Sequence, residues 1–244
     1  MKLTIIALGL LMGPSLTASA AQAPAKAPAN GAQRFEVTSI KAVRPTLVRT
    51  IAALEKGDGA GAKAAFDAYD SGWNGVEVYI NTRSPEMYNA LERELQAAIT
   101  AGLNESSPNV ANILALSKAM LAKFDEAIAM VEKAEPLGPL YDEVARLRIV
   151  RAHLREVNPA MKAGDLAKAR KSFDEFQDKW DSIEDLIKER DIKAYNLIEG
   201  GMTQIGLALK PAAPDAAKVQ TLVSGVMDEY NKAVAQVTRE ARGR

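Results

Sequence analysis

WNGVEVYINTRSPEMYNALE, at residues 73–92, returns 107 positions later as WDSIEDLIKERDIKAYNLIE, at residues 180–199. The match extends without a gap over residues 57–92 and 164–199. Apolar residues can recur in both copies because both copies pack a core, but the recurrence of charged residues requires a second explanation. The recurrence predicts a tandem duplication of a unit of about a hundred residues. The shared aromatic and charged positions include Trp73, Glu77, Arg83, Tyr88 and Glu92, matched by Trp180, Glu184, Arg190, Tyr195 and Glu199.

Each unit has the periodicity of antiparallel helices joined by short turns. In the first unit, apolar side chains recur every three or four residues, which places them on one helical face. Asp58 and Ser84 are suitable N-caps, and Pro85 suits the first helical position. The predicted helices lie near 45–56, from Asp58 to the corner at Ser84, from Ser84 to Gly102 and from Ser107 onward in the first unit, and at 140–163, 166–189, 191–209 and 214–240 in the second.

The expected fold is all-α, a tandem duplication of a four-helix antiparallel unit. The two copies pack either as two helical bundles or as one merged helical array. Residues 35–44 form either a strand-like arm or a helical turn that Pro45 cuts. The expected division is a signal peptide at 1–20, an Ala/Pro-rich linker at 21–34, a first repeat unit at 35–136 and a second at 137–244.

The start of the chain has the pattern of a secretory signal peptide. Lys2 gives a positive start, and residues 3–16 form an apolar run that is too short for a membrane span. The tripeptide ASA at 18–20 fits a signal-peptidase site, with cleavage before Ala21. We therefore expect a periplasmic protein.

The composition excludes several classes of function. The absence of Cys removes disulfides, thiolate metal sites and Cys nucleophiles. A formal net charge of +0 gives no reason to expect binding to nucleic acid. No later apolar run is long enough for membrane insertion of the mature chain. The chain has a single His and no convergent Ser/Lys pair, so few side chains other than carboxylates could act as a general acid or base. We therefore do not expect an enzyme.

Two explanations of the repeated polar positions stay open. Counting from the corner at Ser84 puts Glu77 level with Glu92 across the helix pair, close to the ring of Trp73. The first explanation is a structural network, in which Arg83 pairs with Glu77 or Glu92. Its members are expected to be Arg83, Arg190, Trp73 and Trp180.

The second explanation is a metal site built from oxygen donors. Metal sites in helical bundles are built from Glu side chains on facing helices, and hard cations prefer such oxygen ligands. His153 lies among arginines and no Glu-x-x-His occurs, which excludes a ferritin-type di-iron centre. The candidate ligands are Glu77, Glu92, Glu184 and Glu199, with Asp70, Tyr88 and Tyr195 as helpers.

The order Phe-x6-Trp-x3-Glu, then Arg, Ser-Pro and Tyr-x3-Glu, resembles the extracytoplasmic helical domain of bacterial Ftr-type iron permeases. In this chain the pattern is Phe66, Trp73, Glu77, Arg83, Ser84-Pro85, Tyr88 and Glu92. The second copy keeps it except for Asp191-Ile192 at the corner, and the resemblance covers most of 45–240. The Arg-Glu-x-x-Glu transport motif and the membrane helices of that family are absent.

The resemblance implies a free-standing periplasmic relative that binds iron or docks on a membrane iron permease. The first hypothesis is therefore a metal-handling accessory protein that holds iron, or a similar cation, through paired Glu side chains. The alternative is a non-catalytic interaction or scaffold protein in which the repeated set is purely structural.

Overall fold

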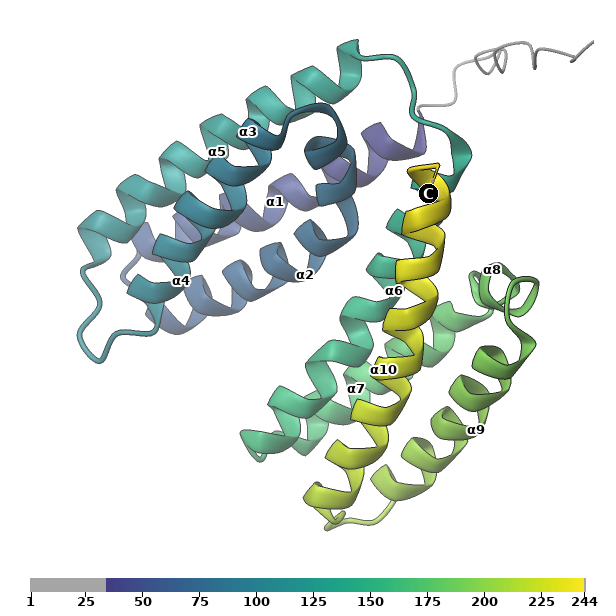
Figure 1. Cartoon of the computed structure of the whole chain (residues 1–244). Coiled ribbons are helices and arrows are strands. Elements are labelled where there is room, and N and C mark those ends of the chain that lie inside the picture. Colours follow the sequence, from purple (N-terminus) through teal and green to yellow (C-terminus); the bar gives the residue numbers. More distant parts are fainter. Residues whose placement is uncertain (1–33, 244) are drawn as a thin grey trace, which may run out of the picture. The chain divides into compact units, whose positions relative to one another are not determined.

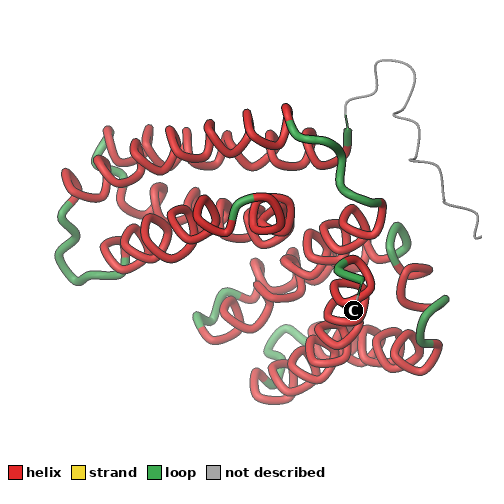
Figure 2. Tube along the Cα trace, turned by 45° about the horizontal axis from the view of Figure 1, so that its top comes forward, coloured by secondary structure: helices red, strands yellow, loops and turns green. Residues whose placement is uncertain are grey.

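The computed structural model describes residues 34–243, and every regular element in that range is a helix (Figure 2). The expectation of an all-α fold is confirmed. The predicted signal peptide and most of the predicted linker lie outside the described residues. The elements are α1 (Phe35–Glu55), α2 (Gly59–Arg83), α3 (Pro85–Asn89), the π-helix η1 (Ala90–Gln96), α4 (Ala97–Leu103), α5 (Val110–Lys133), α6 (Pro139–Lys162), α7 (Leu166–Trp180), α8 (Glu184–Lys188), α9 (Ile192–Leu209) and α10 (Ala216–Ala241).

The segment before Pro45 is neither a strand-like arm nor an interrupted turn. Helix α1 runs from Phe35 through Pro45 to Glu55. A proline inside a helix removes one backbone hydrogen bond and strains the preceding turn. Ile40 and Leu47, on either side of it, are completely buried, and their burial in one core holds the helix continuous across the proline.

The structure departs from the predicted helices at one stretch in each unit. The single helix predicted at 166–189 ends at Trp180 and resumes as α8 at Glu184. Asp181 and Ser182, in the gap, are weak helix formers because their side chains compete for backbone hydrogen bonds. In the first unit, the helix predicted from the corner to Gly102 contains the π-helix η1. One π turn often marks a functional position.

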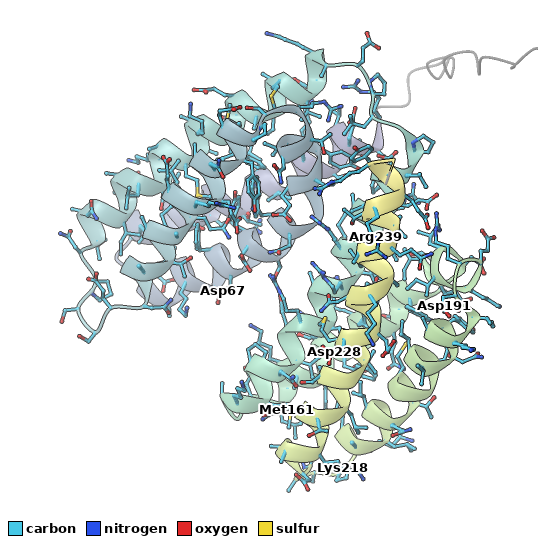
Figure 3. All side chains as sticks on the ribbon, viewed as in Figure 1. Asp67, Met161, Asp191, Lys218, Asp228 and Arg239 are labelled. Atoms are coloured by element: carbon cyan, nitrogen blue, oxygen red, sulfur yellow. The ribbon has the colours of Figure 1, made fainter. Side chains whose placement is uncertain are left out.

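The helix starts expected at Asp58 and Ser84 are present, whereas the helix expected from Ser107 begins at Val110, with Asn109 as its N-cap. Asp58 accepts a hydrogen bond from the amide of Gly61 at 2.8 Å, and Ser84 accepts one from the amide of Met87 at 3.1 Å. Asp191, labelled in Figure 3, caps α9 in the same way, through the amides of Lys193 and Ala194. These caps satisfy amides that would otherwise lack partners at the helix ends.

A turn with a left-handed glycine precedes both α2 and α7. Gly57 has φ 71° and Gly164 has φ 73°, a left-handed conformation that glycine adopts without steric cost. The duplication itself stays a prediction, but the turns recur at the predicted spacing of 107.

Each predicted repeat unit packs its own helices, and α6 joins the two units. In the first unit α1 packs against α2 and α5, while η1 and α4 pack on α5 (Figure 1). In the second unit α6 packs against α7 and α10, and α9 packs on α10. Helix α2 also packs against α6, so the described residues form one compact unit.

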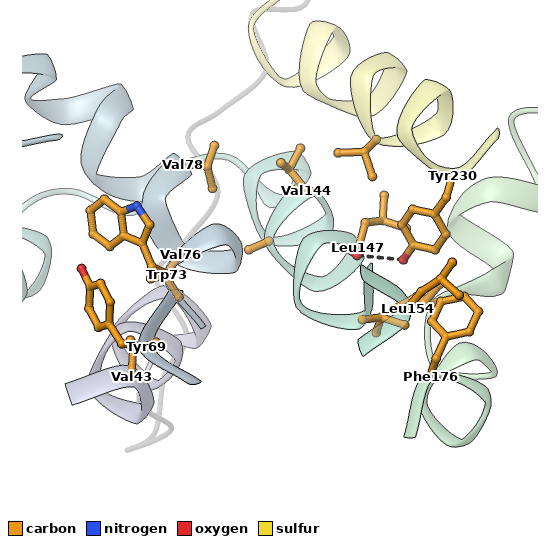
Figure 4. Close-up of a cluster of buried hydrophobic side chains, with 14 of the residues drawn as sticks. Val43, Tyr69, Trp73, Val76, Val78, Val144, Leu147, Leu154, Phe176 and Tyr230 are labelled. Carbon is orange, nitrogen blue, oxygen red and sulfur yellow. Dashed lines mark hydrogen bonds between the residues drawn. The ribbon is translucent and has the colours of Figure 1, made fainter. Parts of the chain in front are cut away.

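Aromatic side chains fill the centre of each helix group. Trp73 is completely buried and stacks on Tyr69 with ring centroids 6.0 Å apart. Trp180 is 2% exposed and lies 6.0 Å from the ring of Phe176. Figure 4 shows these groups on either side of α6, together with the hydrogen bond from the Tyr230 hydroxyl to the Leu147 carbonyl at 2.7 Å. Both Trp residues are therefore anchors of the hydrophobic core.

The junction of α2 and α6 depends on the absence of a side chain at Gly75. A Cβ atom at Gly75 would collide with Ile149 of α6. Near this contact, Val78 of α2 faces Val144 of α6 (Figure 4). The close approach lets apolar side chains of both units share one core.

We expect the substitution Gly75→Ala to destabilise the protein by about 1–3 kcal/mol because it overpacks the junction of α2 and α6. Adding Ile149→Ala should recover part of this loss, since it removes the colliding side chain. Urea unfolding measures both effects.

Gly225→Ala in α10 is the matched control, because a Cβ there meets nothing within 4 Å. Relief of the glycine penalty should stabilise this variant by about 0.5–1 kcal/mol. Equal effects of the two glycine substitutions would contradict the role of Gly75.

Within the described residues, no helix is long and apolar enough to cross a membrane.

Candidate functional site

A hydrogen bond from tryptophan to glutamate recurs in both predicted units. The indole nitrogen of Trp73 donates to Glu92, and the indole nitrogen of Trp180 donates to Glu199. A buried indole N–H requires an acceptor, so each Trp fixes one carboxylate on the neighbouring helix segment. This contact accounts for the repeated Trp and for one of the two repeated Glu residues.

A tyrosine ring lies over each tryptophan and close to both glutamates of its unit. Tyr88 stacks on Trp73, with 6.2 Å between the ring centroids. Loss of solvation is the main effect that raises the pKa of the Tyr88 phenol, and the negative charges of Glu77 and Glu92 raise it further. The Trp73 ring therefore contacts both the Tyr88 ring and the Glu92 carboxylate, and Glu77 lies near enough for its charge to act on the Tyr88 phenol.

The second unit repeats this arrangement. Tyr195 stacks on Trp180 at 6.3 Å. Loss of solvation raises the pKa of the Tyr195 phenol, followed by the charges of Glu199 and Glu184 and a hydrogen bond to Glu184. The four candidate ligands thus fall into two pairs, each beside a Trp–Tyr stack.

Arginines of α6 hold the acidic groups of the first unit. Arg148 binds Glu77 at 2.6 Å, and Arg155 binds Asp70 at 2.5 Å. Asp70 also accepts a hydrogen bond from Gln96 of η1 at 2.8 Å. The Glu77 carboxylate is therefore paired with a cation that belongs to the second unit.

Arg83 does not pair with Glu77 or Glu92, and that expectation is wrong. Its guanidinium binds Glu36 of α1 at 2.7 Å, with side-chain exposures of 9% and 4%, and the Tyr79 carbonyl at 3.0 Å. The Arg83 side chain points from the corner toward Glu36, in the stretch 35–44 for which the sequence left two structures open.

The second unit has the same contact at the predicted spacing. Arg190 binds Glu143 of α6 at 2.7 Å and Glu240 of α10 at 2.8 Å. Both repeated arginines therefore tie the corner of a unit to its first helix, which makes them structural.

Burial raises the pKa of both glutamates in the first unit. For Glu77, Arg148 opposes the effect of burial and the charge of Glu92 adds to it. For Glu92, the hydrogen bond from Trp73 opposes burial and the charge of Asp70 adds to it. Both carboxylates are thus held where a negative charge is less stable than in water.

Several polar atoms at the same junction have no hydrogen-bond partner among the described residues. They are the Tyr69 hydroxyl, the Gln96 side-chain oxygen and the Arg148 Nε. Buried polar groups cost free energy when they are unpaired. The polar network of the first unit is therefore incomplete on the side where α2, η1 and α6 meet.

The second pair of glutamates lacks such arginines. Within the described residues, neither Glu184 nor Glu199 takes part in an ion pair. Gln177 stands at the position of Asp70, and no later helix packs on α7 as α6 packs on α2. Glu184 and Glu199 are half-buried, so they remain partly accessible.

The α7–α8 surface also differs in polarity from its counterpart on α2. Ser182 replaces Gly75 and Asp185 replaces Val78, and both replacements are exposed. In repeat proteins a polar outer face is typical of a terminal unit. The acidic pair of the second unit therefore lies on a polar, solvent-exposed surface.

His153 is not part of either pair of glutamates. Its Nδ1 lies 3.0 Å from Glu175 of α7, and its side chain is 24% exposed. In the described part of the chain, no three His, Cys, Asp or Glu side chains are arranged to hold a metal ion. Any metal bound by a glutamate pair would need donors of other kinds, such as the tyrosine phenols.

Sequence reasoning did not assign Glu36, Arg148, Arg155 or Gln96 to the site. Glu36 and Glu143 are also 107 positions apart, so a longer alignment contained that signal. The arginines at 148, 151 and 155 have helical spacing, but nothing local shows that they face another unit.

We expect Glu77→Gln/Glu92→Gln to change how stability depends on pH. Folded Glu77 and Glu92 bind a proton more readily than unfolded ones, so their contribution to the unfolding free energy rises as pH falls from the raised pKa values toward 4.5. The variant lacks this contribution. The stability of the variant relative to the wild type should therefore be highest at pH values above the raised pKa values, and it should decline as the pH is lowered toward 4.5. Urea unfolding at a series of pH values measures this difference.

Glu240→Gln provides a control of opposite sign. A hydrogen bond from Arg190 lowers the pKa of Glu240, so that group stabilises the fold above 4.5 and loses its effect as pH falls through the lowered value. The stability deficit of this variant should shrink at low pH. Parallel pH profiles for wild type and the double variant would contradict the assignment.

Comparison of the chain with protein-family models, with characterised proteins and with solved structures finds no match.

Proposed function

We propose that the chain is a non-catalytic, metal-handling accessory protein that binds a hard cation such as iron through Glu184 and Glu199, with Tyr195 as a third oxygen donor. The observation that carries the proposal is the contrast between the two glutamate pairs. Arg148 neutralises Glu77 in the first unit, whereas no cation of the described chain pairs with Glu184 or Glu199.

A purely structural account explains Glu77 but not Glu184. Glu77 binds Arg148 and so connects α2 to α6. Glu184 stands at the equivalent position, but within the described residues no arginine of a further helix pairs with it. Glu184 adds a second carboxylate beside Glu199, and hard cations bind such oxygen donors. The neighbouring cation Lys188 lies over the ring of Tyr195, 4.9 Å from its centroid, and pairs with neither glutamate in the described chain.

The donor set suits loose binding. One oxygen of Glu199 accepts the Trp180 hydrogen bond, which leaves its other oxygen for a ligand. Two carboxylates and a phenol leave several positions on a hard cation for water or for a chelator such as citrate. Such a site favours transfer of the cation over permanent storage.

The resemblance to the extracytoplasmic domain of Ftr-type iron permeases supports iron as the cation and a membrane iron permease as the acceptor. The signal-peptide pattern at 1–20 supports a periplasmic location. We therefore place the protein outside the cytoplasm, where it presents iron to an uptake system.

We expect calorimetric titration with Fe(III)-citrate, Fe(II) and Mn(II) to detect one site per chain for at least one of these probes. The variant Glu184→Gln/Glu199→Gln should lose this heat, because neutral amides replace both charges. It should still fold, since the glutamine oxygen can accept the Trp180 hydrogen bond.

The matched control is Glu77→Gln/Glu92→Gln, which alters the pair that Arg148 already occupies and should bind as the wild type does. Circular dichroism melts check that each variant is folded. Identical heats for the wild type and the Glu184/Glu199 variant would refute the proposal, and so would loss of binding only in the control.

A second candidate function is that of an interaction or scaffold protein. It is favoured by the observation that Trp73, Arg83, Glu77 and Glu92 all have partners within the fold. In that case the repeated set maintains the angles between helices. Failure of every metal probe in the titration, with both variants folded, would support this candidate.

A further inference from the structure

The first helix of each predicted unit carries an arginine at the same position. Arg44 of α1 and Arg151 of α6 are 107 positions apart. Each contacts the last helix of its own unit, because Arg44 binds Asp125 of α5 and Arg151 binds Asn231 of α10. The same contact therefore recurs, but with chemically different partners.

The two partners also occupy equivalent positions. The helical stretch at 85–103 of the first unit is one residue longer than α9 in the second, so later positions correspond at a shift of 106. At this shift Asp125 corresponds to Asn231. The residues before them, Phe124 and Tyr230, correspond as well, and both are completely buried. A carboxylate in one unit is thus a neutral amide in the other.

The two arginines use different edges of the guanidinium group. Arg44 donates from Nε to one oxygen of Asp125 at 2.6 Å and from Nη2 to the other oxygen at 2.9 Å, which is a bidentate contact with a carboxylate. Arg151 donates from Nη1 to the side-chain oxygen of Asn231 at 2.9 Å. Within the described residues, Nε and Nη2 of Arg151 have no acceptor. The edge that holds a carboxylate on Arg44 is therefore unoccupied on Arg151.

Arg151 lies among other arginines, unlike Arg44. Arg148 and Arg155 stand one helical turn to either side of it on α6, and each of them is bound to an acid of α2. The equivalent positions beside Arg44 are a lysine and a valine. Positive charge is therefore concentrated on α6, where the middle arginine has no acid of its own.

The surroundings of Arg151 disfavour its positive charge. Loss of solvation lowers the pKa of Arg151 and the charges of the two flanking arginines lower it further, whereas Tyr230 and Glu77 oppose both effects. For Arg44, the hydrogen bond to Asp125 is the main effect, and it raises the pKa. A half-buried cation without its own counter-ion is costly, and an anion at the unoccupied edge would reduce that cost.

The unoccupied edge is not taken by the acid that follows on α10. Asp228 precedes Asn231 by one helical turn and is exposed (Figure 3). In the part of the chain that the structure describes, Asp228 forms no ion pair. Arg151 is only half-buried, so a small ligand has access to it from solvent.

We propose that Arg151 binds the carboxylate group of a small organic acid through Nε and Nη2, independently of any metal binding. The ligand takes the place that the side chain of Asp125 has on Arg44. The planar guanidinium group matches the two oxygens of a carboxylate. The charges of Arg148 and Arg155 add attraction at longer range, which favours acids with more than one carboxylate.

Calorimetric titration with sodium succinate at low ionic strength tests the proposal on the full chain without its predicted signal peptide. Low salt is used because contacts between partly exposed charges weaken as ionic strength rises. The wild type should bind one succinate per chain, and Arg151→Gln should weaken binding by about tenfold or more. Arg44→Gln is the matched control and should bind as the wild type does, since Asp125 already occupies that arginine.

A variant that restores the counter-ion tests the position of the ligand. Asn231→Asp recreates the contact of Arg44 with Asp125, so its own carboxylate should occupy Arg151 and weaken succinate binding by about tenfold or more. Asp228→Asn removes an unpaired acid one turn away and should bind at least as tightly as the wild type. Circular dichroism melts verify that each variant is folded.

A wild type that does not bind succinate, or equal binding by the wild type and Asn231→Asp, would overturn the proposal. Tighter binding of inorganic phosphate than of succinate at Arg151 would overturn the assignment to carboxylates. Succinate contains no metal, and Fe(II) and Mn(II) contain no carboxylate, so this site and the proposed metal site can fail separately. Citrate alone serves as the blank for the titration with Fe(III)-citrate.

Discussion

The need to satisfy a buried indole N–H dominates both halves of this structure. Trp73 and Trp180 lie in the aromatic centres of their helix groups, and each donates to a carboxylate 19 positions later. The helix segment that follows the corner must therefore place a glutamate against the ring. The corner angle, the tyrosine stack and the position of the second glutamate all depend on this contact. Packing alone would not require the same polar residues in both places.

Helix α6 makes the two halves unequal. It is the first helix of the second unit and the outer neighbour of α2. Its arginines therefore neutralise acids that belong to the first unit, while the second unit has no equivalent neighbour. A repeated sequence thus produces two sites with different electrostatics. In one, arginines of α6 pair with the acids Glu77 and Asp70, and in the other both glutamates are without an ion pair in the described chain.

The sequence predicted most of the helices because their signals are local. Asp58, Ser84 and Pro85 mark helix starts through their own side chains, and the apolar spacing on α2 needs no knowledge of the rest of the fold. The π-helix at 90–96 and the break at 181–183 were missed, since both depend on small differences in backbone geometry. Pro45 obscured α1 because the burial of its neighbours outweighs the effect of the proline.

The candidate site was only partly predictable for the same reason. The convergence of two carboxylates and a phenol follows from counting along one helix pair. The partner of Arg83 does not, because it lies on α1, whose structure was ambiguous. The pairing of Glu77 with Arg148 requires knowing how one unit packs on the next, and no local pattern contains that information.

The contact between Gly75 and Ile149 also shows what a helix surface needs in order to accept a close neighbour. Helix α2 offers α6 a flat, apolar surface at Gly75 and Val78, whereas Ser182 and Asp185 place polar side chains at the corresponding positions. Replacing these two residues with glycine and valine would give the second surface the same shape and make it able to recruit a further helix.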